Sequence, residues 1–523
     1  MCDVLGPLVG AAQGIDSQEL QQLVESIARH GRRCVRPRPG LDLSTIPFAT
    51  EPVPWCSAGR FLMDDGFRPG GSLHYAAGNY AIQDAASLLP ISLMEIRPGQ
   101  DVCDVCAAPG GKSAAILDQL QGKGLLLSNE VIASRVDTLQ LALARTGWDN
   151  YVISNVGSER LAEVVAESFD CVLVDAPCTG QSMIARGKQS LSAFSNHQIA
   201  HSAARQQSIL RSALQLVRPG GRLVYSTCTF AFDENEAIVA WLRETLPTWR
   251  PVMLDQLLPW QTPGVAGCYR LWPHRDRCAG GFAAALARPL DDMMLPHEKQ
   301  EHNSTAIDLD ERSDRLSPSA RSGGRKPRFA AARVKGSSVA ASVSSAQWSV
   351  WHDSVVMHQF GQIGEFDSVA QVGLESQTIS GAQHSSEAQL SLAARAGEPT
   401  GSVPEFWQRR HRAYWFSPDV PAAWRGLAYA GIEVAGSFGE HWQPSYPLSV
   451  LGAEASAWFR PHHRVQLSDA EAVAYMSGSS LHRAGEPGWC IVCWSDRALG
   501  WGKQVGSQLK NHLPKPLRQP SLR

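Results

Sequence analysis

The sequence has no large excess of charge of either sign and no long apolar run. Lysine and arginine number 48, aspartate and glutamate 50, and the net charge is -2. This balance excludes a uniformly basic coat for nucleic acid but leaves room for a local basic face. Without a run of about 18 uncharged apolar residues, we expect no membrane partner. Asp3 stands where a signal peptide has a basic residue, so we expect no export and a cytoplasmic location.

Cysteine is also sparse. The 12 cysteines in 523 residues lack the dense spacing of a disulfide scaffold, which favours a reducing compartment. Two Cys-x-x-Cys pairs, Cys103/Cys106 and Cys490/Cys493, have the spacing of zinc ligands. Both pairs lie in strand-like runs, VCDVC and WCIVCW, where side chains three residues apart point to opposite faces. We therefore predict buried thiols and no metal site.

The composition predicts several folded units joined by a polar segment. Hydrophobic residues are 44% and charged residues 19% of the chain, enough for large cores. The stretch after residue 290 is rich in serine, arginine, alanine and glycine, which is typical of linkers, with a strand-like piece at 348–356. We expect five parts: an N-terminal region (1–95), a main domain (96–290), a linker or mobile insert (291–404), a connecting domain (405–465) and a C-terminal domain (466–523).

Two signals stand out in the N-terminal region. Asp16 to Glu19 resembles a helix-capping box and precedes apolar residues at helical spacing, so we predict a helix that ends before Gly31. The run RRCVRPRPG then places Arg32, Arg36 and two further arginines close together. Both a solvated loop and an edge that contacts phosphates remain open for this run.

Residues 96–290 alternate short apolar runs with helical periodicity, which predicts an α/β domain with a parallel sheet covered on both faces. Helical periodicity marks SAAILDQL, SRVDTLQLALART and ARQQSILRSALQLV between the strands. The expected strands are VCDVC, GLLLSNE, YVISNV, FDCVLVDAP and GRLVYSTC.

The first of these strands leads into the small-residue loop 107–112, AAPGGK, and then into a helix. Small residues at a strand's carboxyl end let a ligand approach the backbone, and ligands bind at that edge of a doubly wound sheet. The loop lacks the glycine patterns of dinucleotide and P-loop sites. Glu130 ends the next strand and can accept hydrogen bonds from ribose hydroxyls. We therefore favour nucleoside binding over an ordinary tight turn.

Two cysteines and an aspartate follow the later strands. Asp175 and Cys178 end one strand, and Cys228 ends another, so all three fall on the rim that carries the loop. A thiolate is a strong nucleophile once its pKa is lowered. Alone, each cysteine would pass for a small buried residue, but their convergence beside a nucleoside pocket favours catalysis.

These motifs resemble a known family. DVCAAPGGKSAAI, DAPCTG and YSTCTFAFDENEAIV are similar to the S-adenosylmethionine-dependent RNA cytosine-C5 methyltransferases of the NOL/NOP/Sun (NSUN) family, over about residues 75–290. The C-terminal motifs GEHWQPSYPLSV and LGWGKQVGSQLKNHLPKPLR resemble the bacterial RsmF-type 16S ribosomal RNA enzymes. The resemblance implies a Rossmann-like class I methyltransferase domain, a small N-terminal RNA-binding region and a C-terminal PUA-like β-barrel.

The resemblance also implies residue roles. Cys228 would be the nucleophile, Cys178 would help release the product, and Asp175 would face the methionine end of the cofactor and the target base. Glu130 would hold the ribose. Where the family has an acid for the adenine, this sequence has Gly157, whose backbone contact would remain, with Val131 or Ile132 packing as compensation. The S-adenosylmethionine loop would comprise Cys106, Ala107, Ala108, Pro109, Gly110, Gly111 and Lys112.

We therefore expect a monomeric enzyme that methylates C5 of a cytosine in RNA through a Cys–C6 adduct, most plausibly in 16S ribosomal RNA. The tail after Asp496 has lysines and arginines and no acid, which suits phosphate contact. Transfer RNA is an alternative substrate, and a catalytically silent RNA-binding ribosome-assembly factor is an alternative function. A DNA enzyme would place its nucleophile in a Pro-Cys-Gln motif, whereas Pro177-Cys178 is followed here by Thr179.

Overall fold

A computed structural model describes residues 16–27, 31–291, 405–409, 411–417, 419–438, 441–451 and 464–522. Nearly all of the expected linker, including the strand-like piece at 348–356, lies outside these residues. In the part of the chain that the structure describes, no helix is both long and apolar enough to span a membrane.

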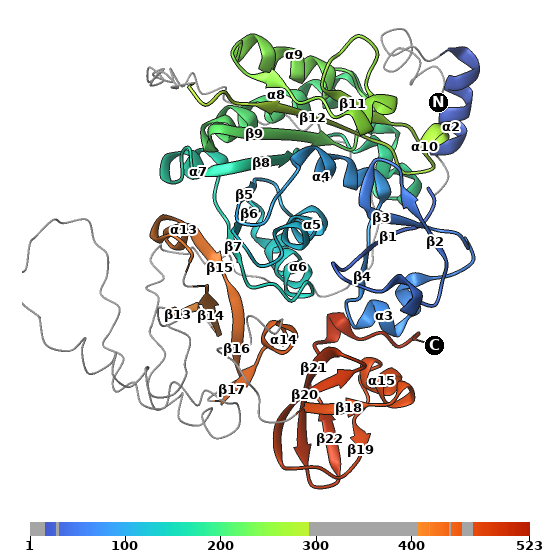
Figure 1. The fold of residues 1–523 in the computed structure, drawn as a ribbon, viewed down its shortest axis with the longest axis vertical. Coiled ribbons are helices and arrows are strands. Elements are labelled where there is room, and N and C mark those ends of the chain that lie inside the picture. Colours follow the sequence, from blue (N-terminus) through green and yellow to red (C-terminus); the bar gives the residue numbers. More distant parts are fainter. Residues whose placement is uncertain are drawn as a thin grey trace, which may run out of the picture. The chain divides into compact units, whose positions relative to one another are not determined.

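The main domain is built on a nine-stranded sheet (Figure 1). Five neighbouring parallel strands form its centre in the order β9-β8-β5-β6-β7, as the alternating pattern predicts. They are β5 (Asp101–Asp104), β6 (Leu125–Asn129), β7 (Tyr151–Ser154), β8 (Phe169–Asp175) and β9 (Val217–Thr227).

Antiparallel strands extend the sheet at both edges, which the sequence pattern did not indicate. On one side β12 (Gly281–Ala287) pairs with β9, and β10 (Arg250–Pro251) and β11 (Cys268–Leu271) pair with β12. On the other side β15 (Ala428–Ala430) pairs with β7. The segment expected as a connecting domain thus contributes a strand to the main sheet and covers its edge.

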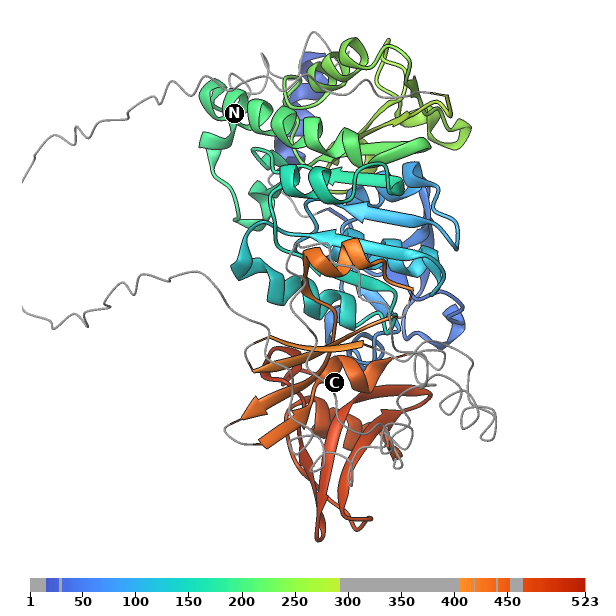
Figure 2. The same cartoon turned by 90° about the vertical axis from the view of Figure 1, so that its left-hand side faces the viewer.

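Both faces of the parallel strands are buried, because successive side chains enter different cores. Val102 packs in one apolar cluster and Cys103 in the other, and Leu126 and Leu127 divide in the same way. Figures 1 and 2 show helices on both sides of the strands. One cluster contains side chains of α4 (Leu89–Met94), α5 (Gly111–Leu120) and α6 (Ala133–Ala144), and the other those of α7 (Ser158–Val164), α8 (Asn196–Ala213), α9 (Glu236–Thr245) and α13 (Ala422–Leu427).

The N-terminal residues form a helix and a four-stranded sheet of order β2-β3-β1-β4. The predicted helix is present as α2, and Asp16 caps it by accepting a hydrogen bond from the Glu19 amide at 2.8 Å. The elements are α2 (Ser17–Ile27), β1 (Cys34–Pro37), β2 (Thr50–Val53), β3 (Cys56–Leu62), α3 (Leu73–Ala76) and β4 (Tyr80–Ile82).

The arginine-rich run is part of this sheet, so the solvated-loop interpretation is wrong. Arg36 lies on β1, is buried and forms an ion pair with Asp118. Arg32 forms an ion pair with Glu51. These two guanidinium groups are used within the protein and are not free to contact phosphates.

Two further sheets follow. The first has the order β13-β14-β16-β17 and the second, of five strands, the order β18-β20-β21-β22-β19. Cys490 and Cys493 both lie on β20 and pack in different clusters, which confirms the strand argument for this pair. For the other pair the argument is wrong, because β5 ends at Asp104 and the half-buried Cys106 packs against the same cluster as Cys103. The elements are β13 (Glu405–Arg409), β14 (Arg412–Phe416), β16 (Ile432–Phe438), β17 (His441–Pro444), α14 (Tyr446–Val450), β18 (Arg464–Leu467), α15 (Asp469–Met476), β19 (Leu481–His482), β20 (Gly488–Trp494), β21 (Arg497–Val505) and β22 (Gln508–Asn511). The short helix α10 (Pro273–Asp276) precedes β12.

The strand order changes direction between β5 and β8. The chain runs outward from β5 to β6 and β7, then returns to β8 and β9 on the other side of β5. At such a switch point the loops that follow the two central strands diverge and leave a crevice at their carboxyl ends. The loop 107–112 follows β5, and Cys178 follows β8, so the crevice receives the residues singled out in the sequence.

Gly110 offers a test of this packing. It begins α5 with φ +105°, and a β-carbon there would lie 2.6 Å from the Ala142 β-carbon on α6. Gly99 has a similar φ of +95° but open space around it. Both Gly→Ala variants should lose about 1–2 kcal/mol from the left-handed backbone, and Gly110→Ala about 1–3 kcal/mol more from overpacking. Urea denaturation measures the difference; equal losses would contradict the close α5–α6 contact.

Candidate active site

A cavity of about 710 Å³ opens at the carboxyl ends of β5, β6, β8 and β9. This size is ordinary for a small-molecule site. It brings together most of the residues that the sequence singles out, from four different strands. These lining residues are Cys106, Ala107, Ala108, Pro109, Gly111, Lys112, Glu130, Asp175, Cys178 and Cys228.

Two predicted residues do not line the cavity. Gly110 begins α5 and faces α6, so its role is close helix packing. Gly157 precedes α7 and is also outside the lining. The expected backbone contact of Gly157 with a ligand therefore finds no support. Val131 and Ile132 do line the cavity and are exposed by 55% and 44%, so an apolar surface stands beside Glu130.

Glu130 is held in place by its neighbours. One carboxylate oxygen accepts a hydrogen bond from the Ile132 amide at 2.8 Å, and the other pairs with Arg135 at 3.1 Å. Arg135 in turn donates to the Ala108 carbonyl at 2.6 Å. The guanidinium therefore joins the strand end of β6 to the loop after β5 and fixes the carboxylate at the cavity wall.

Lys112 and Asp175 form an ion pair inside the cavity, with 2.7 Å between the ammonium and a carboxylate oxygen. The other oxygen of Asp175 accepts a hydrogen bond from the Ser226 hydroxyl at 2.7 Å. Burial alone lowers the pKa of Lys112, but the facing carboxylate outweighs it and the pKa ends above its ordinary value. The pair therefore presents a fixed cation and a fixed anion to a bound molecule.

The thiols of Cys178 and Cys228 lie in contact, with their sulfur atoms 3.3 Å apart. The Cys228 amide also donates toward the Cys178 sulfur at 3.4 Å. The contact arises because β8 and β9 are parallel neighbours with Asp175 opposite Ser226, so the residues that follow both strands meet on one rim.

The two thiols differ in acidity. The hydrogen bond from Cys178 lowers the pKa of Cys228, burial and the Asp175 carboxylate oppose this, and the Lys112 ammonium and Ser182 lower the pKa further. The pKa of Cys178 is raised well above its ordinary value by the same hydrogen bond and by burial. The contact thus favours the proton on Cys178 and the thiolate form of Cys228.

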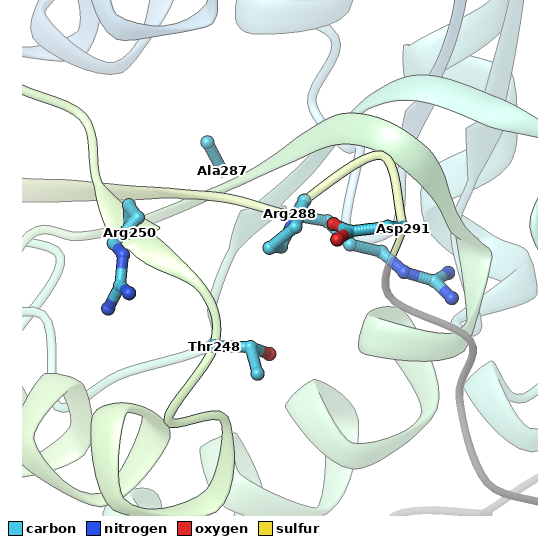
Figure 3. A pocket seen from close by; sticks show the side chains of 6 residues that line it. Thr248, Arg250, Ala287, Arg288 and Asp291 are labelled. Carbon is cyan, nitrogen blue, oxygen red and sulfur yellow. The ribbon is translucent and has the colours of Figure 1, made fainter.

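A second hollow, of about 460 Å³, lies at the end of β12 (Figure 3). Its lining includes Thr248, Arg250 and Asp291 and contains none of the predicted site residues. Arg288, which also lines it, donates to the Val217 carbonyl at 2.6 Å and pairs with Glu167 at 2.7 Å. This arginine joins the ends of β9 and β12, so its role is structural.

Family models match two parts of the chain. Residues 91–287 match the 16S rRNA methyltransferase RsmB/F family, and residues 462–519 match the PUA domain of methyltransferase RsmF. The two matches show that these parts of the chain are similar to RsmB/F proteins. The first match covers eight of the nine strands of the main sheet and most of the cavity lining, and the second covers the five-stranded C-terminal sheet, which is the PUA domain that the resemblance implied.

Individual proteins are also similar to this chain. Ribosomal RNA small subunit methyltransferase F of Enterobacter sp. (strain 638) is 34% identical over 265 residues, which are 49% of this chain and 55% of that protein. The same-named protein of Citrobacter koseri is 26% identical over 90% of this chain and 86% of its own. A methyltransferase homologue from Pyrococcus horikoshii is similar in structure, at 25% identity and a TM-score of 0.47, over 55% of this chain and 93% of its own.

RsmB/F proteins use S-adenosylmethionine, and the cavity fits the amino-acid end of this cofactor. Asp104 at the end of β5 and Gln83 line the cavity, and each has a buried polar atom without a partner: the Asp104 Oδ1 acceptor and the Gln83 Nε2 donor. An acceptor and a donor in the lining of one cavity match an ammonium and a carboxylate. Burial raises the pKa of Asp104 to about 7, and a cationic ligand would favour its charged form.

Asp104, Gln83 and Arg135 were missed by the sequence reasoning. Asp104 sits within the quoted loop motif, so its position beside Cys106 was a usable signal. Gln83 directly follows β4 of the N-terminal sheet and is oriented by Arg36, which donates to its side-chain oxygen at 3.1 Å. That contact joins residues 47 positions apart, and no periodicity or spacing indicates it.

The unequal thiols predict a specific effect of Lys112. Because its ammonium favours the Cys228 thiolate, Lys112→Met should raise the pKa of Cys228. A rise of about one unit would slow iodoacetamide labelling of Cys228 at pH 7.5 about tenfold. Labelling is followed by mass spectrometry of the peptide that contains Cys228. Lys123→Met, an exposed lysine at the opposite end of β6, serves as the control, and a Lys112→Met variant that labels as fast as this control would contradict the electrostatic account.

Proposed function

We propose that the protein transfers a methyl group from S-adenosylmethionine to C5 of a cytosine in RNA, in the small-subunit ribosomal RNA. The proposal rests on the contact between two thiols whose pKa values are shifted in opposite directions. Their sulfur atoms lie 3.3 Å apart in the cavity that contains Lys112 and Asp175. Cytosine C5 is a poor nucleophile, and a neighbouring thiolate is the group that can activate it.

The Cys228 thiolate adds to C6 of the cytosine, and the electron pair of the C5–C6 double bond moves to C5. Asp175 accepts a hydrogen bond from the amino group of the base and orients it, and the Lys112 ammonium beside Asp175 offsets the negative charge that develops on the base. The ion pair with Lys112 orients Asp175. When bound, S-adenosylmethionine supplies the methyl group that C5 then takes up.

Cys178 has its task after this addition. While Cys228 is a thiolate, its charge keeps the proton on Cys178. Once the Cys228 sulfur is bonded to C6 that charge is gone, so Cys178 can release its proton to solvent and, as a thiolate, act as the base that removes the C5 proton. The C5–H electron pair restores the double bond, and Cys228 leaves as a thiolate and regains its hydrogen bond from Cys178.

The base must leave its stack for this chemistry, because a stacked cytosine cannot present C6 to a thiolate. The PUA domain offers a basic surface for the rest of the RNA. Lys503 on β21 and Lys510 on β22 are exposed and directly opposite each other. Like charges in this position repel, and an RNA phosphate would relieve the repulsion. Arg497, in contrast, is used inside the protein, where it donates to the Ala77 carbonyl.

Alanine variants of the two cysteines should lose methyl transfer at different steps. Cys228→Ala should abolish methyl transfer, because no nucleophile then reaches C6. Cys178→Ala should add to RNA and then stall before the C5 proton is lost, which gives a slowly migrating protein–RNA band on a denaturing gel. Cys268→Ala, a buried cysteine on β11, is the matched control and should behave as the wild type. Normal turnover by Cys178→Ala without an adduct would contradict the assigned roles.

The basic pair of the PUA domain predicts a salt effect. Lys503→Ala/Lys510→Ala should weaken RNA binding and reduce the slope of log K against log salt by about 1.5, because about two phosphate contacts are lost. Filter binding over a salt series measures this. Lys123→Ala should leave the slope unchanged, and an unchanged slope in the double variant would exclude this surface from RNA contact.

A further inference from the structure

Glu234 lies behind the two catalytic cysteines and is fully buried, with 0% of its surface exposed. It belongs to the segment between β9 and α9, and it does not line the cavity. No arginine, lysine or histidine within the described residues forms an ion pair with it. A buried carboxylate without a cation is costly, so its hydrogen bonds indicate what it does.

The carboxylate joins the loops that follow β8 and β9. Thr179, the residue after Cys178, donates to it from its amide at 3.0 Å and from its hydroxyl at 2.5 Å. Thr229, the residue after Cys228, donates from its hydroxyl at 3.1 Å. Each cysteine is therefore followed directly by a threonine, and both threonines donate hydrogen bonds to the same carboxylate.

Helix α8 completes the network. Gln206 donates to the carboxylate at 2.9 Å, and the Tyr225 hydroxyl donates to the backbone carbonyl of Glu234 at 2.6 Å. The hydroxyl oxygens of Thr179 and Thr229 are themselves 2.9 Å apart. Burial raises the pKa of Glu234, and the four hydrogen bonds that its carboxylate accepts oppose this rise and favour the ionised form.

We propose that Glu234 is a positioning residue that assigns the roles of the two cysteines. Its hydrogen bonds to both loops hold the sulfur atoms in contact, and its negative charge lies on the Cys178 side, where it opposes a second thiolate. Lys112 and Asp175 act on Cys228 from the cavity, and Glu234 acts on Cys178 from behind. The inference rests on the proposed roles of Cys178 and Cys228.

The variant Glu234→Gln tests the effect of the charge separately from the effect of the hydrogen-bond geometry. The amide oxygen can still accept from the Thr179 amide and Gln206, and the amide nitrogen can donate to the hydroxyls of Thr179 and Thr229, because hydroxyls both donate and accept. The connections therefore survive and only the charge is lost. Glu244→Gln removes an exposed carboxylate from α9 and is the matched control.

The charge is tested by iodoacetamide labelling of Cys178 between pH 7 and pH 10, in full-length protein that carries Cys228→Ser, without RNA or cofactor. Loss of the Glu234 charge should lower the pKa of Cys178, and in this protein, which lacks the Cys228 thiol, Tyr225 is the other titratable neighbour. A shift of about one unit makes labelling at pH 8.5 about tenfold faster than in the Cys228→Ser parent. Equal rates in the Glu234→Gln protein, its parent and the Glu244→Gln control would overturn the electrostatic role.

The geometry is tested with both cysteines present. Dibromobimane becomes fluorescent when it bridges two neighbouring thiols, and the wild type should be bridged at Cys178 and Cys228. Thr229→Val removes one hydrogen bond to Glu234 and should slow bridging about threefold. Thr245→Val, an exposed threonine on α9, is the control. An unchanged rate of bridging in Thr229→Val would overturn the proposal that Glu234 holds the two sulfur atoms in contact. The bridging experiment still tests that proposal if Glu234→Gln does not fold.

Neither measurement uses methyl transfer. If labelling and bridging change as expected but the wild type methylates no RNA, the role of Glu234 stands and the proposed function fails. If the wild type methylates RNA but neither measurement changes, the proposed function stands and the role of Glu234 is refuted.

Discussion

The contact between the Cys178 and Cys228 sulfur atoms is the interaction on which the account of this protein depends. Two neighbouring thiols can share one proton, and the hydrogen bond from Cys178 lowers the pKa of Cys228, with a further lowering by the Lys112 ammonium. In the proposed mechanism, bonding of Cys228 to a base removes the charge that keeps Cys178 protonated, so Cys178 can then lose its proton and act as a base. A single cysteine in this cavity would supply a nucleophile but no second group that becomes a base after the nucleophile has reacted.

The fold supplies this contact through strand order rather than through local sequence. Cys178 and Cys228 are 50 residues apart, and they meet because β8 and β9 are adjacent and parallel. The loop after β5 joins them because the sheet changes direction between β5 and β8. The match to the RsmB/F family model extends over these same elements, so the cavity lies in the part of the chain that is similar to that family.

The parallel strands, the Gly-rich loop and the rim with both cysteines could be predicted, because apolar runs and strand-end residues are local signals. The antiparallel strands β12 and β15 could not, since their pairing joins distant segments. Arg36 was wrongly placed at the surface because arginine is rarely buried, and its partner Asp118 is remote in sequence. Gly157 was expected to contact a ligand only because of its position after β7. No local sequence pattern indicates the role of Glu234, because its contacts form only when three elements of the fold come together.

The most direct measurement uses RNA that contains 5-fluorocytidine. Fluorine at C5 cannot leave as a proton does, so the wild-type protein with S-adenosylmethionine should stop at the covalent adduct. Digestion and mass spectrometry should then find the modified nucleotide on Cys228, with Cys178 unmodified. A nucleotide on Cys178, or no adduct with RNA that is otherwise methylated, would contradict the central claim.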